Sequence, residues 1–186
     1  RMRDWHTVGI DCVAMNANDL FVMNVEPVAF VDYIATDRLS VEEVAQNGEG
    51  LNEGARQANL NMVGGETAQL PGLVHGLDLA GACLGVQEKK TVVTGEKIRP
   101  GDCIVGVPSS GIHSNGLSLA RRIVEKSGGY TERLPDGMTL GEALLVPTRI
   151  YRESLEACRR ADVHGMCHVT GSGLLNFPRL TGYGFE

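Results

Sequence analysis

The stretch from Asp11 to Ile34, DCVAMNANDLFVMNVEPVAFVDYI, contains the two patterns that decide the fold. From Asp11 to Asn24 the apolar residues follow the helical period, and Asp11 would place a carboxylate at the favourable N-terminal end of a helix. Pro27 ends this helix, and Val28–Ile34 is a nearly continuous apolar run, which is typical of a strand buried on both faces. A helix followed at once by a buried strand indicates a protein that mixes helices with a sheet.

The rest of the first half continues this alternation. Val41–Ala58 has a helical pattern weakened by glycines, and Leu60–Val63 reads as a strand that leads into a loop at Gly64–Thr67. Leu77–Glu88 is another strand, interrupted by glycine. Charged and turn residues then gather at Thr94–Asp102, which is the best candidate for a domain boundary.

We therefore expect an α/β chain of two domains, residues 1–96 and residues 97–186. The second would begin with a strand at Cys103–Val107, and a later strand at His164–Val169 would follow a helix near Arg149–Arg160. Both ends of the sequence lack the features of a natural terminus, so we expect a fragment whose site is incomplete.

Composition narrows the function classes. The formal net charge of the 186 residues is -6 and the basic residues are scattered, which argues against a nucleic-acid partner. No apolar run is long enough to span a membrane, and the polar start does not resemble a signal peptide. The 5 cysteines show no Cys-x-x-Cys spacing, so reduced, buried thiols are favoured over a zinc site or disulfides. These features predict a cytoplasmic protein.

Asp11, Asn18 and Asp19 share one face of the first predicted helix. The two carboxylates would lie about 12 Å apart along the helix axis, which is too far for both to bind one ion. They could instead serve different ends of a Mg²⁺-polyphosphate, because Mg²⁺ takes one or two carboxylates and completes its shell with phosphate and water. The alternative is structural, with Asp11 as a helix cap and Asp19 on a solvated face.

Three loops combine glycine with polar side chains. Gly64–Thr67 suits either the close approach of a ligand or a tight turn. Ser109–Gly116 offers phosphate capture or acid/base chemistry by His113, in competition with simple helix capping by Ser114. Thr170–Gly173 is a second anion-loop candidate, because it lies between a predicted strand and a predicted helix.

A series of short motifs occurs in order along nearly the whole chain and resembles one enzyme family, the aminoimidazole ribonucleotide synthetases, also called phosphoribosylformylglycinamidine cyclo-ligases. The motifs are Gly9-Ile10-Asp11, Asn18-Asp19-Leu20, Glu26-Pro27, Asp32-Tyr33, Gly64-Gly65-Glu66-Thr67-Ala68, Ser109-Ser110-Gly111, His113-Ser114-Asn115-Gly116 and Pro147-Thr148-Arg149-Ile150-Tyr151. The runs at 64–68 and 109–116 are the most specific of them.

The resemblance implies an N-terminal α+β domain that forms a homodimer, and a C-terminal α/β domain with a mixed sheet flanked by helices. It implies that ATP, with Mg²⁺ and a monovalent cation as a further candidate, phosphorylates the formyl oxygen of formylglycinamidine ribonucleotide. An internal nitrogen then attacks the iminophosphate, releases phosphate and closes the imidazole ring. Such an enzyme must neutralise polyphosphate charge and fold its substrate for an intramolecular attack.

Residue roles follow from the same resemblance. His113, Asp19 and Glu66 would be catalytic, with Asp19 and Asp11 as the metal contacts. The cofactor contacts would be Asp11, Asn18, Asp19, Gly64, Gly65 and Glu66. The substrate contacts would be Ser110, Gly111, His113, Asn115, Thr170, Gly171, Ser172 and Gly173.

The sequence also departs from the family pattern. The glycine-rich N-terminal segment with its lysine is missing, Asn24-Val25 replaces Gly-Ala, and Ser172 replaces a glycine in the later loop. Other ATP-using relatives are the nearest alternatives: the amidotransferase-coupled synthetase of the preceding step, selenophosphate synthetase and thiamine monophosphate kinase. A dimerising or nucleotide-sensing protein without catalysis is the alternative from another class.

Overall fold

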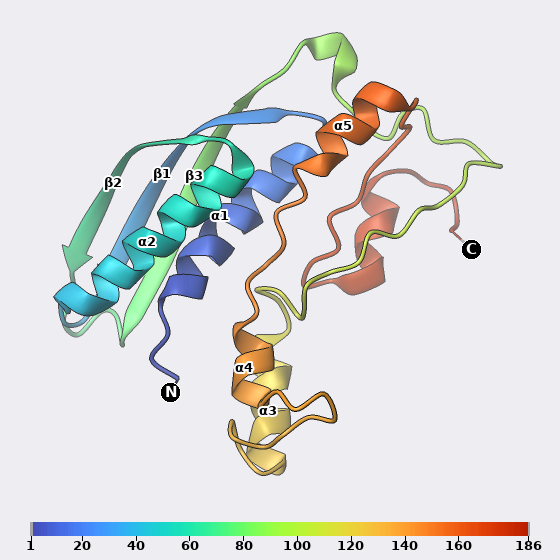
Figure 1. Cartoon of the computed structure of the whole chain (residues 1–186). Coiled ribbons are helices and arrows are strands. Elements are labelled where there is room, and N and C mark those ends of the chain that lie inside the picture. The colour runs from blue at the N-terminus through green and yellow to red at the C-terminus, as the bar shows by residue number, and fades with distance from the viewer. Residues whose placement is uncertain (1, 186) are drawn as a thin grey trace.

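The computed structural model describes residues 2–185 (Figure 1). The first half contains α1 (His6–Phe21), β1 (Glu26–Thr36), α2 (Val41–Ala58), β2 (Asn61–Gln69) and β3 (Leu77–Val86). A 3-10 turn, η1 (Lys89–Thr91), leads out of it. The second half contains α3 (Leu117–Lys126), α4 (Leu140–Leu145), α5 (Glu153–Arg160) and the 3-10 helix η2 (Gly173–Arg179). Across residues 2–185, no helix has the length and apolar character needed to cross a bilayer.

The three strands form one mixed sheet in the order β2-β1-β3. β1 runs parallel to β2 and antiparallel to β3, with a bulge in the β1–β2 pairing between Phe30 and Val31. The parallel pair is joined through α2, so β1, α2 and β2 form a βαβ unit. The mixed α/β class expected from the sequence is therefore confirmed.

Helices α1 and α2 cover one face of the sheet and lie side by side (Figure 1). Between them and the sheet lies the core, which includes Val13, Ala17, Phe21, Phe30 and Leu51. The other face of the sheet carries no layer within the described chain. The expectation that both faces of Val28–Ile34 are buried was wrong, because Val31 and Tyr33 point to this open face and are 41% and 40% exposed.

The two helices approach closely because glycines line their contact. A Cβ on Gly50 would lie 1.9 Å from the carbonyl oxygen of His6, and one on Gly9 would lie 2.5 Å from that of Asn47. The glycines that appeared to weaken the α2 pattern therefore serve packing, because each close approach buries backbone against backbone.

Two boundaries in the first half differ from the sequence-based expectation. α1 begins at His6, whose N–H is accepted by the Asp4 carboxylate at 3.1 Å, so Asp11 lies inside the helix and not at its N-terminal end. β2 continues through Gly64–Thr67, which was expected to be a loop, because this segment keeps its parallel pairing with β1. Gly65 lies beside Asp32, and a Cβ there would lie 2.3 Å from the carboxylate oxygen, so the missing side chain makes room for Asp32 in the strand.

The second half is less regular than expected. η2 lies where a helix was predicted after Thr170–Gly173, and α5 occupies most of the range predicted near Arg149–Arg160. The strands expected at Cys103–Val107 and His164–Val169 were wrong, because neither segment has a hydrogen-bonded partner strand within residues 2–185. α4, which a Thr139–Glu142 capping box begins, was not predicted.

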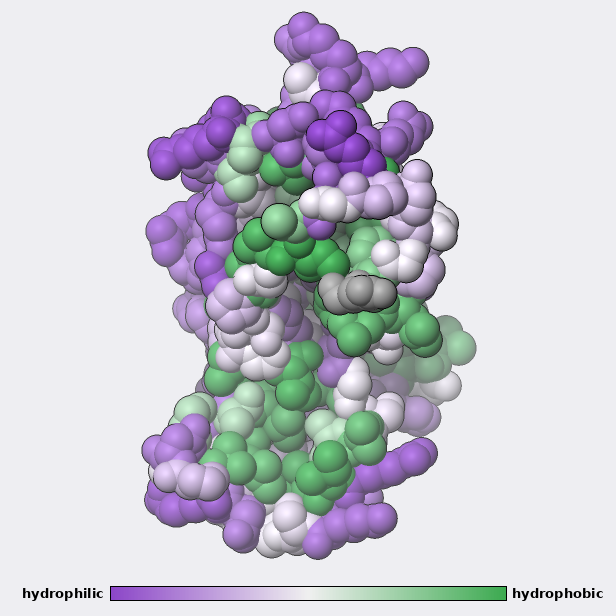
Figure 2. Space-filling model, turned by 90° about the vertical axis from the view of Figure 1, so that its right-hand side faces the viewer, coloured by the Kyte–Doolittle hydropathy of each residue, from purple (hydrophilic) through white to green (hydrophobic). Residues whose placement is uncertain are grey.

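Much of the apolar sequence of the second half remains on the surface. Figure 2 shows apolar side chains gathered on the side of the molecule that carries this half. Val105 is 82% exposed, and Leu174 and Leu175 are 73% and 75% exposed. The segment after the predicted boundary is held by polar contacts instead: His164 Nδ1 lies 2.7 Å from Asp102, and Lys97 Nζ lies 3.1 Å from Asp162.

We predict that Gly50→Ala lowers the free energy of unfolding by about 3 kcal/mol, because the added methyl group must push α1 away from α2. Gly48→Ala in the same helix is the matched control, because its Cβ would meet nothing within 4 Å. That control should stabilise the protein by about 0.5 to 1 kcal/mol through helix propensity. Urea unfolding of both variants checks the prediction, and equal effects would contradict the glycine-packing argument.

Candidate functional site

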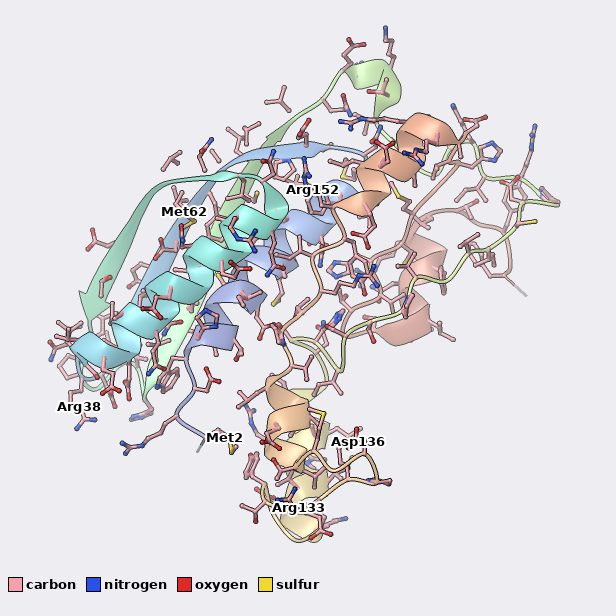
Figure 3. The ribbon with its side chains drawn as sticks, viewed as in Figure 1. Met2, Arg38, Met62, Arg133, Asp136 and Arg152 are labelled. Carbon is pink, nitrogen blue, oxygen red and sulfur yellow. The ribbon has the colours of Figure 1, made fainter. Side chains whose placement is uncertain are left out.

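The site is organised around residues 147–151, an extended segment that runs along α1. The Asn18 side chain, only 1% exposed, contacts this segment in both directions. Its Nδ2 donates to the carbonyl oxygen of Arg149 at 2.9 Å, and its Oδ1 accepts from the backbone N–H of Tyr151 at 3.0 Å. Figure 3 shows the labelled Arg152 at the base of α5, where this segment ends. A side-chain amide thus pairs with the backbone as a neighbouring strand would.

Asp11, nearer the start of α1 than Asn18, also binds this segment. Its Oδ1 accepts a hydrogen bond from the backbone N–H of Thr148 at 2.7 Å. Asp11 and Asn18 therefore share a face of α1, as their spacing predicted, but in this structure both are bonded to the backbone of the 147–151 segment. Their roles as cofactor or metal contacts stay predictions.

The opposite side of the 147–151 segment fixes the predicted Ser109–Gly116 loop. Ser110 Oγ donates to the carbonyl oxygen of Pro147 at 2.7 Å, and the hydroxyls of Ser114 and Thr148 lie 3.1 Å apart. Helix α3 begins after Gly116 without a side-chain cap, so capping by Ser114 does not account for this loop. The loop residues instead serve to dock onto the 147–151 segment.

His113 lies at the centre of this loop. Its Nε2 accepts hydrogen bonds from the backbone N–H groups of Ser110 at 3.2 Å and Arg149 at 3.5 Å. Its own backbone has a φ of 56°, in the left-handed region that non-glycine residues rarely adopt. Burial lowers the pKa of His113, the charge of nearby His168 lowers it further, and the Asp11 carboxylate acts in the opposite direction. Burial and His168 therefore favour the neutral ring.

Arg149 supplies the positive charge nearest to His113 in this segment. Its guanidinium donates to the carbonyl oxygen of Pro108 at 3.2 Å, pairs with Glu153, and lies 5.2 Å from the centre of the Tyr151 ring. The Tyr151 hydroxyl also donates to Pro108, at 3.2 Å. These contacts attach Pro108, just before the 109–116 loop, to the base of α5. They also place the Arg149 guanidinium beside the polar groups of that loop.

Asp19, farther along α1, contacts a histidine that sequence reasoning missed. His168 Nδ1 lies 2.8 Å from Asp19 Oδ1, and the His168 side chain is only 10% exposed whereas that of Asp19 is 72% exposed. The available signal was the position of His168, two residues before the predicted anion loop at Thr170–Gly173. A nearly buried histidine thus orients an accessible carboxylate.

The two predicted loops of the second half lie next to each other. A Cβ on Gly171 would lie 3.5 Å from the side-chain oxygen of Asn115. The 170–173 loop is a turn closed by the N–H of Gly173 donating to the carbonyl oxygen of Thr170 at 2.9 Å, and η2 begins at its end. The N–H of Thr170 is already bonded to the Asn176 side chain at 3.1 Å.

The group of residues around His113 does not include Gly64, Gly65 and Glu66. They lie on β2, and Glu66 pairs in register with Tyr33, whose side chain is on the open face of the sheet. Among residues 2–185, no group of three or more His, Cys, Asp or Glu side chains is arranged to hold a metal ion.

Comparisons with known proteins find related sequences for both halves of the chain. The profile of AIR synthase related protein, N-terminal domain, matches residues 1–87, and that of the C-terminal domain matches residues 99–177. Phosphoribosylformylglycinamidine cyclo-ligase from Methanococcoides burtonii is 52% identical over 100% of this chain, and that from Thermococcus kodakarensis is 53% identical over 97% of it. These alignments cover 56% and 54% of the relatives, so the chain spans about half their length.

Solved structures share the fold at low sequence identity. Thiamine-monophosphate kinase from Stenotrophomonas maltophilia K279a matches with a TM-score of 0.60 and 20% identity, over 83% of this chain and 47% of that one. Hydrogenase maturation protein HypE in complex with ATP matches with a TM-score of 0.53 and 20% identity, over 67% of this chain and 36% of that one.

We predict that Asn18→Ala lowers the free energy of unfolding by about 2 to 4 kcal/mol, because it leaves the half-buried carbonyl of Arg149 and N–H of Tyr151 without partners. Asn16→Ala is the control: its side chain bonds only to the Cys12 carbonyl, one turn back in the same helix. Urea unfolding measures both variants. A cost for Asn18→Ala no larger than that of the control would contradict the role of this amide.

Proposed function

The chain belongs to the AIR synthase related proteins, and from this premise we propose that it forms part of an ATP-dependent cyclo-ligase that converts formylglycinamidine ribonucleotide to aminoimidazole ribonucleotide in purine biosynthesis. The observation that carries the proposal is the 52% identity to a phosphoribosylformylglycinamidine cyclo-ligase along the full length of this chain. The structures of thiamine-monophosphate kinase and HypE support only the shared fold, because their identity to this chain is 20%.

In the proposed reaction the formyl oxygen of the substrate attacks the γ-phosphorus of ATP and releases ADP. An amine nitrogen of the same substrate then attacks the activated carbon, the oxygen leaves with inorganic phosphate, and the ring closes. The enzyme must hold the two reacting ends together and stabilise negative charge on phosphoryl oxygens. The neighbouring loops at 109–116 and 170–173, with Arg149 beside the first, offer hydrogen-bond donors and a cation for this purpose.

We assign Mg²⁺-ATP to Asp19 first. Its carboxylate is accessible and only one of its oxygens has a hydrogen-bonding partner, His168, which fits an ion that completes its shell with phosphate oxygens and water. Mg²⁺ would neutralise polyphosphate charge when bound. Asp11 fits less well as a second contact, because its Oδ1 already accepts from Thr148. A monovalent cation remains a candidate without an assigned site.

On the substrate side we propose Ser110, Gly111, His113 and Asn115 as contacts, with His113 polarising the oxygen that is phosphorylated. The predicted loop of Thr170, Gly171, Ser172 and Gly173 would receive a phosphate through the N–H groups of Gly171 and Ser172, because those of Thr170 and Gly173 already donate within the protein. Gly64, Gly65 and Glu66 lie on β2, away from the residues around His113. Any contact that they make with cofactor or substrate would form outside that group of residues.

We propose that the open face of the sheet forms the homodimer interface. Its exposed apolar residues include Val31, Tyr33, Leu84 and Val86, which come from two adjacent strands. A sheet face of this kind is normally covered, because a contiguous apolar surface gains free energy when it leaves water. We further propose that the protein works in the cytoplasm, where its ATP and nucleotide precursors are found.

We predict that the full-length natural protein releases ADP from Mg²⁺-ATP only when formylglycinamidine ribonucleotide is present. His113→Ala should lower this rate by about 100-fold, the usual effect of removing one donor to a developing negative charge. Arg133→Ala is the control, because Figure 3 shows Arg133 at the far end of the second half. ATP turnover indifferent to this substrate would favour a relative with another substrate, and no turnover would favour a sensing protein.

We also predict that the full-length protein is a dimer in solution and that Tyr33→Asp converts it to a monomer, because a buried carboxylate on the sheet face has no partner. Light scattering coupled to size exclusion measures the mass. Val41→Asp, at an 82% exposed position on the other layer, should remain a dimer. A monomeric parent protein, or a Tyr33→Asp dimer, would exclude this interface.

A further inference from the structure

The hydrogen bonds around His113 define which of its ring nitrogens carries a proton. Nε2 lies 3.2 Å from the backbone nitrogen of Ser110 and 3.5 Å from that of Arg149. A backbone N–H can only donate, so Nε2 must present its lone pair to both groups. A neutral imidazole has one proton, and it must then be on Nδ1.

We propose that His113 acts as a neutral hydrogen-bond donor through Nδ1–H, directed at the formyl oxygen of the substrate, and not as the base that removes a proton during ring closure. The donor role rests on the proposed cyclo-ligase function, whereas the position of the proton rests on the structure of this loop alone. A base would need a free lone pair, and the lone pair of His113 is already shared by two backbone N–H groups.

The two backbone donors cannot turn away from the ring easily, because the chain on either side of them is fixed. The Ser110 side chain is bonded to Pro147, and the carbonyl of Arg149 is bonded to the buried Asn18. Next to Arg149, the N–H of Thr148 is held by Asp11 at 2.7 Å. Helix α1 therefore holds the chain around the Arg149 N–H, and the Ser110 side chain holds the chain that carries the other N–H.

The backbone and surroundings of His113 favour the same state. A non-glycine residue with a φ of 56° is retained only where its surroundings hold it, and such residues are common at functional sites. A second ring proton would point an N–H at two other N–H groups, and burial and His168 also disfavour the charged ring. Within residues 2–185 no group accepts a hydrogen bond from Nδ1, so this donor is free for a ligand.

Neutral histidine is a suitable donor for this chemistry. A neutral imidazole can polarise a substrate oxygen without transferring its proton, as neutral histidines do in other enzymes. The formyl oxygen of formylglycinamidine ribonucleotide has to remain nucleophilic towards ATP, and full protonation would use one of its lone pairs and give it a positive charge. A hydrogen bond from Nδ1–H would position this oxygen and stabilise the charge of the later phosphoryl group.

The tautomer can be measured without any activity. In protein labelled with ¹⁵N at histidine, long-range ¹H–¹⁵N spectra distinguish a ring protonated at Nδ1 from one protonated at Nε2 and from the imidazolium. The chain has 5 histidines, and the signals absent in His113→Asn identify the ring of interest. We expect the neutral Nδ1–H pattern at neutral pH. A proton on Nε2, or a doubly protonated ring, would overturn the proposal.

A matched pair of variants in the full-length protein tests the donor role. Asn places an amide N–H near the position of Nδ1 and tolerates the left-handed backbone, whereas Gln reaches the position of Nε2, where its carbonyl oxygen can accept from the two backbone N–H groups but no donor replaces Nδ1–H. Substrate-dependent ADP release should be about tenfold faster for His113→Asn than for His113→Gln, the worth of one hydrogen bond. Equal rates, or a faster Gln variant, would overturn the donor role.

The two measurements separate two kinds of failure. If the spectra show Nδ1–H but the parent enzyme releases ADP without regard to this substrate, the cyclo-ligase function is wrong and the donor role in that reaction fails with it. If ADP release depends on the substrate but the proton is on Nε2, the function stands and the inference about His113 is wrong. Thermal unfolding of both variants verifies that each remains folded.

Discussion

The hydrogen bonds of one buried amide, that of Asn18, hold the 147–151 segment on α1, and the arrangement of the site depends on them. Because this amide both donates and accepts, it fixes the direction of the segment as well as its position. The segment in turn holds Ser110, Ser114 and the His113 ring through its other side. An apolar residue at position 18 could pack against the segment, but it could not specify where each backbone N–H points, and directed N–H groups are what the loop requires.

The first half of the fold was predictable because its signals are local. The apolar periods of α1 and β1, and the turn residues between elements, each act within a few residues and agree with the tertiary structure. The misplaced features are those that depend on distant partners. Cys103–Val107 has the composition of a strand, but composition cannot supply a neighbour to pair with, and none lies within residues 2–185. Gly64–Thr67 reads as a turn by composition, yet pairing with β1 makes it a strand.

The sequence predicted which residues belong to the candidate site better than it predicted how they are arranged. Helical spacing correctly put Asp11 and Asn18 on one face, but spacing could not reveal that the face meets a backbone segment more than 130 residues away. The polar content of the loop marked His113 as important, whereas the φ of 56° and the two N–H groups on Nε2 arise from tertiary contacts. His168 was missed because its one signal in the sequence is its position just before the 170–173 loop, and the importance of that position comes from the contact with Asp19.

These contacts also divide the polar groups of α1 into two classes. Asp11 and Asn18 both hold the 147–151 segment: Asn18 is buried and its oxygen and nitrogen are both bonded, and Asp11 binds the segment through Oδ1. Asp19, with its 72% exposed side chain, keeps most of its capacity for a ligand. Asp19 with His168 therefore presents an accessible carboxylate, whereas the polar groups around His113 and Arg149 are held by the 147–151 segment and the 109–116 loop.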